Sequence, residues 1–166
     1  IPARAKATGI YINSALARTE AEENGYDEAI MLTAAGHVSE GSGENVFIVR
    51  DGVLVTPGRS ENILEGITRA TIMQLARDEF GIETIERSID RTELYIADEM
   101  FLCGTGAQIS AVSHVDNRMV GSGEIGPITA NLMKLYFDVV KGKHPKYAHW
   151  CTSVYPANVS AAVSQA

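Results

Sequence analysis

Positive charge is scarce in this sequence, which carries 14 Lys and Arg residues against 21 Asp and Glu residues, for a net charge of −7. Nucleic acids and anionic membranes are bound through clustered Lys and Arg side chains, so we expect neither as a main partner. No apolar run approaches the roughly 20 residues that span a bilayer. A small-molecule site remains open, because a local pocket can be positive inside an acidic protein.

Cysteine is also rare, with only Cys103 and Cys151. The two residues have no metal-ligand spacing, and two isolated thiols are typical of a reducing compartment rather than of a disulfide scaffold. We therefore predict a cytoplasmic protein that holds no metal ion.

What the sequence does contain is enough for one domain with a hydrophobic core: 166 residues, of which 45% are hydrophobic. The first residues, IPARAKATG, contain no initiator Met. We expect this chain to be part of a longer protein. The last twelve, YPANVSAAVSQA, are small and weakly patterned. We predict one domain over residues 1–154, followed by a tail over 155–166.

Helical periodicity and stop signals predict three helices, at 11–24, 68–80 and 127–141. A glycine follows each of them, at Gly25, Gly81 and Gly142, and glycine favours the left-handed conformation that ends many helices.

Turn residues between apolar stretches predict hairpins. One has Gly36 in its turn, one has Asp51-Gly52, and a third centres on Asp116-Asn117. A short helix and a strand, EMFLC, lead into a Gly-Thr-Gly turn. This pattern indicates a mixed α/β (α+β) fold with antiparallel hairpins plus helices, rather than a doubly wound parallel sheet.

Two turns have the features of anion sites. In ILEGITRATI a glycine precedes a helix, so the first-turn amides and the Thr68 hydroxyl are free to bind phosphate or carboxylate. In GTGAQ two glycines allow close approach to consecutive amides. An ordinary helix start and an ordinary strand-exit turn explain the same residues.

The other candidates are Lys6 and the acidic loop SEGSGEN. Lys6 is flanked by alanines, near an expected strand end, and partial desolvation there would make its amine nucleophilic. Glu40 would accept a proton from a cationic nitrogen. Solvated surface side chains are the alternative for both residues. An amine, a carboxylate and two anion turns together match pyridoxal 5′-phosphate (PLP), which has an aldehyde, a ring nitrogen and a phosphate.

Six segments of the chain, in their order and spacing, resemble the branched-chain amino acid aminotransferases. They are AKATGIYINS, SEGSGENVFIVRDGVLVTP, ILEGITRATI, ELYIADEMFLCGTGAQISAV, GPIT and GKHPKYAHW. The resemblance covers residues 5–154 and implies the large cofactor-binding domain of a fold-type IV PLP enzyme.

The resemblance also implies roles for individual residues. Lys6 would bind the aldehyde and shuttle the catalytic proton, Tyr11 would bond to the ring oxygen, and Glu40 would pair with the ring nitrogen. Glu44 and Asn45 would orient the loop. The phosphate would be held by Leu64, Gly66, Ile67, Thr68 and Thr105, and the substrate α-carboxylate by Gly106 and Ala107.

Family members have a smaller N-terminal domain before the lysine, which is missing from these 166 residues. We expect this piece alone to be inactive, with an open site that lacks the phosphate's main cation.

For the whole protein we expect transamination of leucine, isoleucine and valine with 2-oxoglutarate in a homodimer or larger homo-oligomer. The alternatives are a D-amino acid aminotransferase, an aminodeoxychorismate lyase, or a fragment that only binds or assembles.

Overall fold

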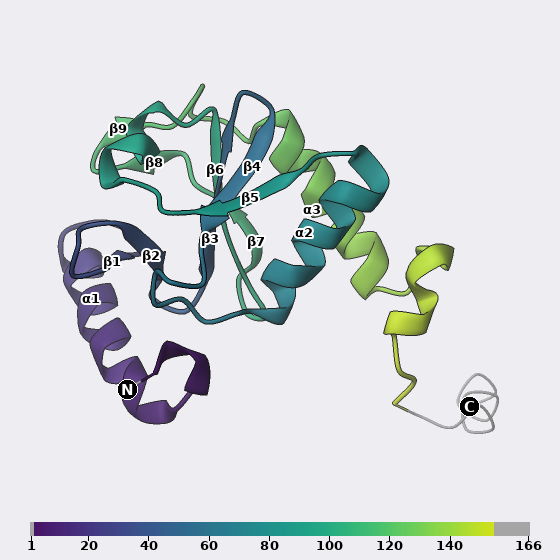
Figure 1. Cartoon of the computed structure of the whole chain (residues 1–166), viewed down its shortest axis with the longest axis horizontal. Coiled ribbons are helices and arrows are strands. Elements are labelled where there is room, and N and C mark those ends of the chain that lie inside the picture. Colours follow the sequence, from purple (N-terminus) through teal and green to yellow (C-terminus); the bar gives the residue numbers. More distant parts are fainter. Residues whose placement is uncertain (1, 155–166) are drawn as a thin grey trace. The chain divides into compact units, whose positions relative to one another are not determined.

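The computed structural model describes residues 2–154, and its fold is mixed α/β, as predicted (Figure 1). The chain divides into two compact units between Met133 and Lys134. The boundaries of the predicted domain, 1–154, stay a prediction, and the predicted tail, 155–166, lies outside the described residues. Within residues 2–154, no helix is both long enough and apolar enough to cross a membrane.

A five-stranded sheet forms the centre of the first unit, in the order β5-β4-β3-β6-β7. The strands are β3 (Asn45–Arg50), β4 (Val53–Pro57), β5 (Thr84–Arg87), β6 (Glu99–Gly104) and β7 (Gln108–Ala111). β3 is central and its first five residues are buried, as expected for an apolar run with neighbours on both sides. The rings of Phe47 on β3 and Phe101 on β6 stack with centroids 5.0 Å apart, which joins the two strands in the core.

The turn between β3 and β4 confirms the hairpin predicted at Asp51-Gly52. Both residues have positive φ, 52° and 77°, which is the type I′ conformation that Asp-Gly favours. The β8–β9 hairpin (His114–Val115 and Arg118–Met119) has the same geometry at Asp116-Asn117, with φ of 48° and 62°.

The parallel strand β5 was not predicted. It follows α2 (Ile67–Phe80) and pairs with β4 in parallel, while the other pairings in this sheet are antiparallel. Gly81 ends α2 with a φ of 64°, as predicted. The segment TIER is short and charged, and it lacks the apolar alternation that indicates a strand. In the structure it is largely unburied.

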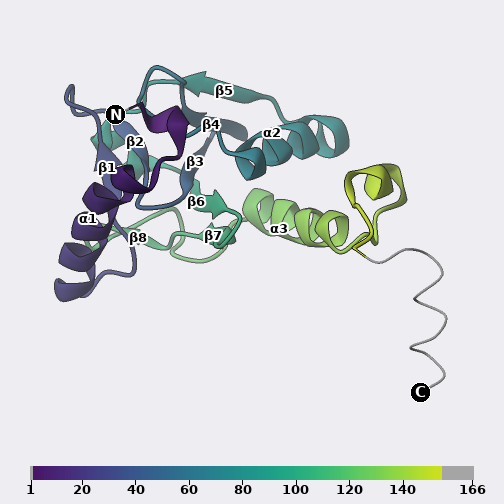
Figure 2. The ribbon, with the colours of Figure 1, turned by 90° about the horizontal axis from the view of Figure 1, so that it is seen from below.

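A second, two-stranded sheet joins β1 (Ile30–Leu32) and β2 (Val38–Gly41), and Gly36 lies in the connecting turn with a φ of 85°. The helix α1 (Tyr11–Glu23) lies beside this hairpin in both views (Figures 1 and 2). None of its residues is buried against other described parts of the chain.

The helix α3 (Pro127–Val140) begins in the first unit and continues into the second. Its N-terminus is capped from a distance by the buried Glu99, which accepts hydrogen bonds from the amides of Ile128 (3.0 Å) and Thr129 (2.7 Å). Gly126 leaves room for this carboxylate, because an added Cβ would lie 2.1 Å from Glu99.

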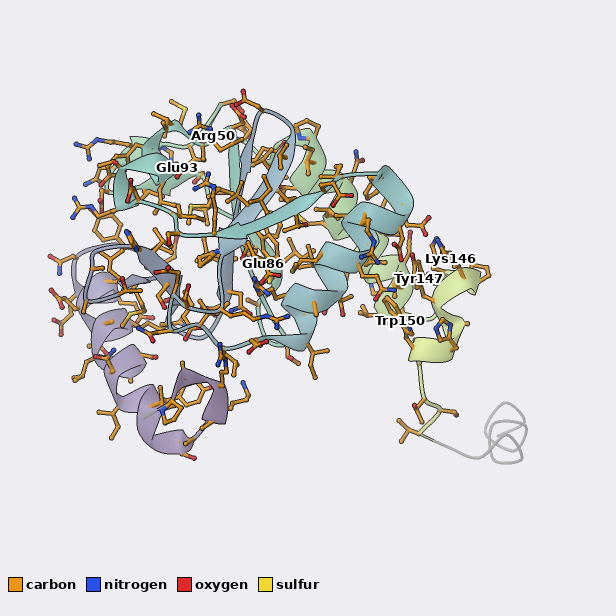
Figure 3. All side chains as sticks on the ribbon, viewed as in Figure 1. Arg50, Glu86, Glu93, Lys146, Tyr147 and Trp150 are labelled. Atoms are coloured by element: carbon orange, nitrogen blue, oxygen red, sulfur yellow. The ribbon has the colours of Figure 1, made fainter. Side chains whose placement is uncertain are left out.

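The second unit also contains the 3-10 helix η4 (Pro145–Trp150). There the rings of Tyr147 and Trp150, labelled in Figure 3, lie with centroids 4.5 Å apart. The ring centroids of His144 and Tyr147 lie 5.0 Å apart.

Candidate active site

A cavity of about 390 Å³ in the first unit is lined by segments that lie far apart in the sequence. Nine of the ten residues predicted to bind the cofactor or the substrate line it: Lys6, Tyr11, Glu40, Leu64, Gly66, Ile67, Thr68, Thr105 and Gly106. Its walls come from the first turns of the chain, from β2, from the start of α2 and from the end of β6.

Lys6 lies between two short 3-10 turns, η1 (Ala3–Ala5) and η2 (Thr8–Ile10). The expected strand end is therefore wrong, because the flanking alanines and glycine form turns here instead of pairing with a sheet. The Lys6 amine is exposed and donates a hydrogen bond to the Tyr11 hydroxyl at 3.0 Å. Its backbone is left-handed, with a φ of 47°, a conformation that costs a non-glycine residue about 1–2 kcal/mol.

Glu40 lies in strand β2, and only Ser42–Glu44 of the predicted loop is irregular. Its Oε2 accepts a hydrogen bond from the Leu64 amide at 2.8 Å, which links the carboxylate to the turn before α2. Burial raises the pKa of Glu40, and the Leu64 amide and the charge of Lys6 oppose that change. A half-buried carboxylate of this kind gains most when a cation comes to lie beside it.

Gly66 is the N-cap residue of α2 and provides no side chain to the first-turn amides. Those amides have no acceptor within the helix, and the helix dipole adds partial positive charge at this end. Ile67 is 86% exposed, so its side chain does not pack over the first-turn amides. Thr68 brings a hydroxyl to the same wall, and the predicted anion site therefore has the donors it needs.

Asn45, on strand β3, contacts the turn before α2. Its Nδ2 donates to the Leu64 carbonyl at 2.8 Å. An added Cβ at Gly66 would lie 2.3 Å from Asn45 Oδ1, so only glycine fits between the turn and β3.

Sequence reasoning missed Arg69, which is 4% exposed on the first turn of α2. Its guanidinium donates to the Pro57 carbonyl at 3.1 Å and to the Glu86 carboxylate at 2.7 Å. Glu86, labelled in Figure 3 between the sheet and α2, comes from β5. No sequence signal identified this pair, since β5 itself was not predicted.

The turn from β6 to β7 supplies Thr105 and Gly106, both exposed to the cavity. Ala107 does not line this cavity. It lines a larger one, of about 1200 Å³, which shares Gly106 and Glu44 with the first. The predicted pair of carboxylate-binding amides therefore lies where the two cavities adjoin.

Glu44 closes the irregular segment, since its Oε2 accepts from the Gly43 amide at 3.0 Å. Burial, together with the nearby carboxylate of Glu28, raises the pKa of Glu44. Cys103 also lines the smaller cavity, and burial raises the pKa of its thiol to about 12, so this sulfur stays protonated and unreactive at neutral pH.

Known proteins resemble the chain closely. The profile of the family described as Amino-transferase class IV matches residues 1–115. A probable branched-chain-amino-acid aminotransferase of Aquifex aeolicus is 54% identical over 155 residues, which cover 93% of this chain and 50% of that protein. The branched-chain-amino-acid aminotransferase of Escherichia coli K12 is 44% identical over 154 residues, with the same two coverages.

Solved structures agree. The branched-chain amino acid aminotransferase of Thermobaculum terrenum in its PLP form matches with a TM-score of 0.91 and 47% identity, over 94% of this chain and 51% of that one. The enzyme from Thermoproteus uzoniensis with norvaline matches with a TM-score of 0.89 and 53% identity, over 93% and 51% of the two chains. The chain thus spans about half the length of these relatives.

Proposed function

The chain belongs to the Amino-transferase class IV family, and from this premise we propose that its protein is a PLP-dependent branched-chain-amino-acid aminotransferase. It transfers the amino group of leucine, isoleucine or valine to 2-oxoglutarate. The observation that carries the proposal is the cavity in which a lysine, a half-buried carboxylate and an uncapped helix N-terminus meet.

The residues of the cavity fit PLP in size and chemistry. Its volume of about 390 Å³ lies in the range of cofactor-sized pockets. The amides of Ile67 and Thr68 and the Thr68 hydroxyl would bind the phosphate, and Leu64, Gly66 and Thr105 would line its site. Lys6 would bind the aldehyde, and the Tyr11 hydroxyl, 3.0 Å from its amine, would bond to the ring oxygen.

When bound, PLP supplies an electron sink for the charge left on the substrate's α-carbon. Glu40 would keep the ring nitrogen protonated and so maintain that sink. Its carboxylate is ready for this role because the Leu64 amide fixes one oxygen, while the unfavourable burial of its charge is relieved by a cationic partner.

Once released from the aldehyde, the Lys6 amine would carry the proton to and from the α-carbon. In the structure this amine donates a hydrogen bond to the Tyr11 hydroxyl at 3.0 Å. The substrate α-carboxylate is received by the Gly106 and Ala107 amides at the junction of the two cavities.

About half of the relatives' length has no counterpart in this chain. We propose that the whole protein has an N-terminal domain there, which completes the site. We propose in addition that the protein is a cytoplasmic homo-oligomer. Cys103 and Cys151 of this chain are both free thiols, as in reducing compartments. The exposed Ile12 and Leu16 on α1 offer apolar surface for an interface.

The experiment uses the full-length protein that contains this chain, supplied with PLP, and compares L-leucine with D-alanine as amino donors. We expect transfer from L-leucine to 2-oxoglutarate, and PLP absorbance that is lost in Lys6→Ala. A preference for D-alanine would favour the D-amino acid enzyme instead. A protein that stays colourless at saturating PLP would contradict the cofactor, and with it the whole proposal.

A further inference from the structure

The backbone of Lys6 needs an external support. It is left-handed, with φ and ψ of 47° and 37°, and both flanking turns are single 3-10 turns. The helix that follows, α1, buries none of its residues against other described parts of the chain. Packing on this helix therefore does not hold the lysine in place within the described structure.

Arg4 provides that support. Its Nε lies 2.7 Å from Glu65 Oε1, and its Nη2 donates to the main-chain carbonyl of Arg59 at 3.1 Å. Both partners belong to the segment that leads into α2. Arg4 thus connects the turn that carries Lys6 to the predicted anion-binding turn, residues 64–68.

Glu65 is well placed to receive this contact, because it lies between Leu64 and Gly66 in the anion-binding turn itself. Arg59 Nε holds its other oxygen at 3.2 Å. The Leu64 amide next to it bonds to Glu40, so a shift of Glu65 would move the turn that serves both the phosphate and the ring nitrogen.

We propose that the Arg4–Glu65 pair is a positioning device that sets the distance between the Lys6 amine and the anion-binding turn. This inference rests on the proposed function. PLP is compact and rigid, and its aldehyde and phosphate are a fixed distance apart, so both ends are bound well only when the two protein segments keep the matching separation. Arg4 acts through Lys6 and is not itself a catalytic residue.

The test compares two cofactor forms in the full-length protein that contains this chain. PLP bonds to Lys6, whereas pyridoxamine 5′-phosphate has no aldehyde and uses only the ring and phosphate contacts. In Arg4→Gln we expect the PLP dissociation constant to rise about five-fold, the effect of one partly exposed ion pair. The constant for pyridoxamine 5′-phosphate stays within about two-fold of the wild type.

Borohydride trapping gives a second readout, with the Lys6–PLP linkage located by mass spectrometry. Less Lys6 is trapped in Arg4→Gln at limiting PLP, and Arg4→Lys recovers part of it. The matched control is Arg59→Gln, which removes an ion pair with the same Glu65 but leaves the Lys6 segment attached through Arg4. Glu65→Gln reproduces the Arg4 effect and serves if Arg4→Gln does not fold. High salt reduces the difference between wild type and variant, because the pair is exposed.

Two failures are distinguishable. If the wild type itself is not trapped at Lys6, the proposed function is wrong. If the wild type is trapped and Arg4→Gln binds PLP equally well, only the positioning role is wrong. Equal weakening of both cofactor forms would make Arg4 a phosphate ligand, and an equal effect of Arg59→Gln would make the pair a general electrostatic contribution. Either result overturns the inference.

Discussion

Replacing Gly66 by alanine tests the contact on which the anion-binding turn depends. Gly66 has φ and ψ of −66° and 139°, which alanine adopts without strain. The change would even reduce the entropy of the unfolded chain, a gain of about 0.4–1 kcal/mol. The expected loss of stability is therefore entirely steric, because the new Cβ would lie 2.3 Å from Asn45 Oδ1.

The magnitude follows from what has to move. Asn45 is buried, in strand β3, and donates to the Leu64 carbonyl at 2.8 Å. Overpacking costs about 1–3 kcal/mol, and a buried group left without its hydrogen bond costs about 1–3 kcal/mol more. After the gain from the unfolded state, we expect Gly66→Ala to lower the free energy of unfolding by about 2–4 kcal/mol.

Urea and thermal unfolding of the cofactor-free protein measure this loss. For a chain of this size it corresponds to a fall in Tm of about 5–15 °C. Gly43→Ala is the control, since among the described residues no atom lies within 4 Å of its added Cβ. In an Asn45→Ala background the same Gly66→Ala change should cost less than about 1 kcal/mol, because the clashing oxygen is gone. A full cost in that background would refute the steric reasoning.

Glu99→Ala removes the distant cap of α3 and its bonds to the amides of Ile128 and Thr129; we expect a loss of about 1–2 kcal/mol in urea unfolding, and an unchanged midpoint would contradict the capping role. Gly106→Ala meets no described atom within 4 Å, so thermal stability should be unchanged while KM for the amino acid rises; an unchanged KM would exclude the carboxylate role. Glu40→Gln should keep PLP bound but lose most turnover, as steady-state rates will show. Burial raises the pKa of Glu40 above its ordinary 4.5. Between pH 4.5 and the raised pKa, the folded protein therefore keeps a proton that the unfolded chain has released. The stability of the cofactor-free protein falls as the pH rises through this range. Glu40→Gln should flatten this fall, and a pH profile identical to that of the wild type would refute the raised pKa of Glu40.

Local structure was predictable where a few neighbouring residues decide it. Asp51-Gly52 and Gly81 take the left-handed conformations expected of them, and α2 begins within one residue of its predicted start. These outcomes depend on φ and ψ preferences, which act over one turn of chain. The family resemblance added the candidate site residues, although it could not supply their contacts.

Tertiary structure decided what local preference cannot reach. It turned a short charged segment into β5 by pairing it with β4, and this brings Glu86 to the buried Arg69 on the first turn of α2. It also brought Arg4 to Glu65 and placed Ala107 in the wall of a different cavity from Lys6. Such contacts join residues that are far apart in the sequence, so they exist only once the whole core has fixed the positions of its strands and helices.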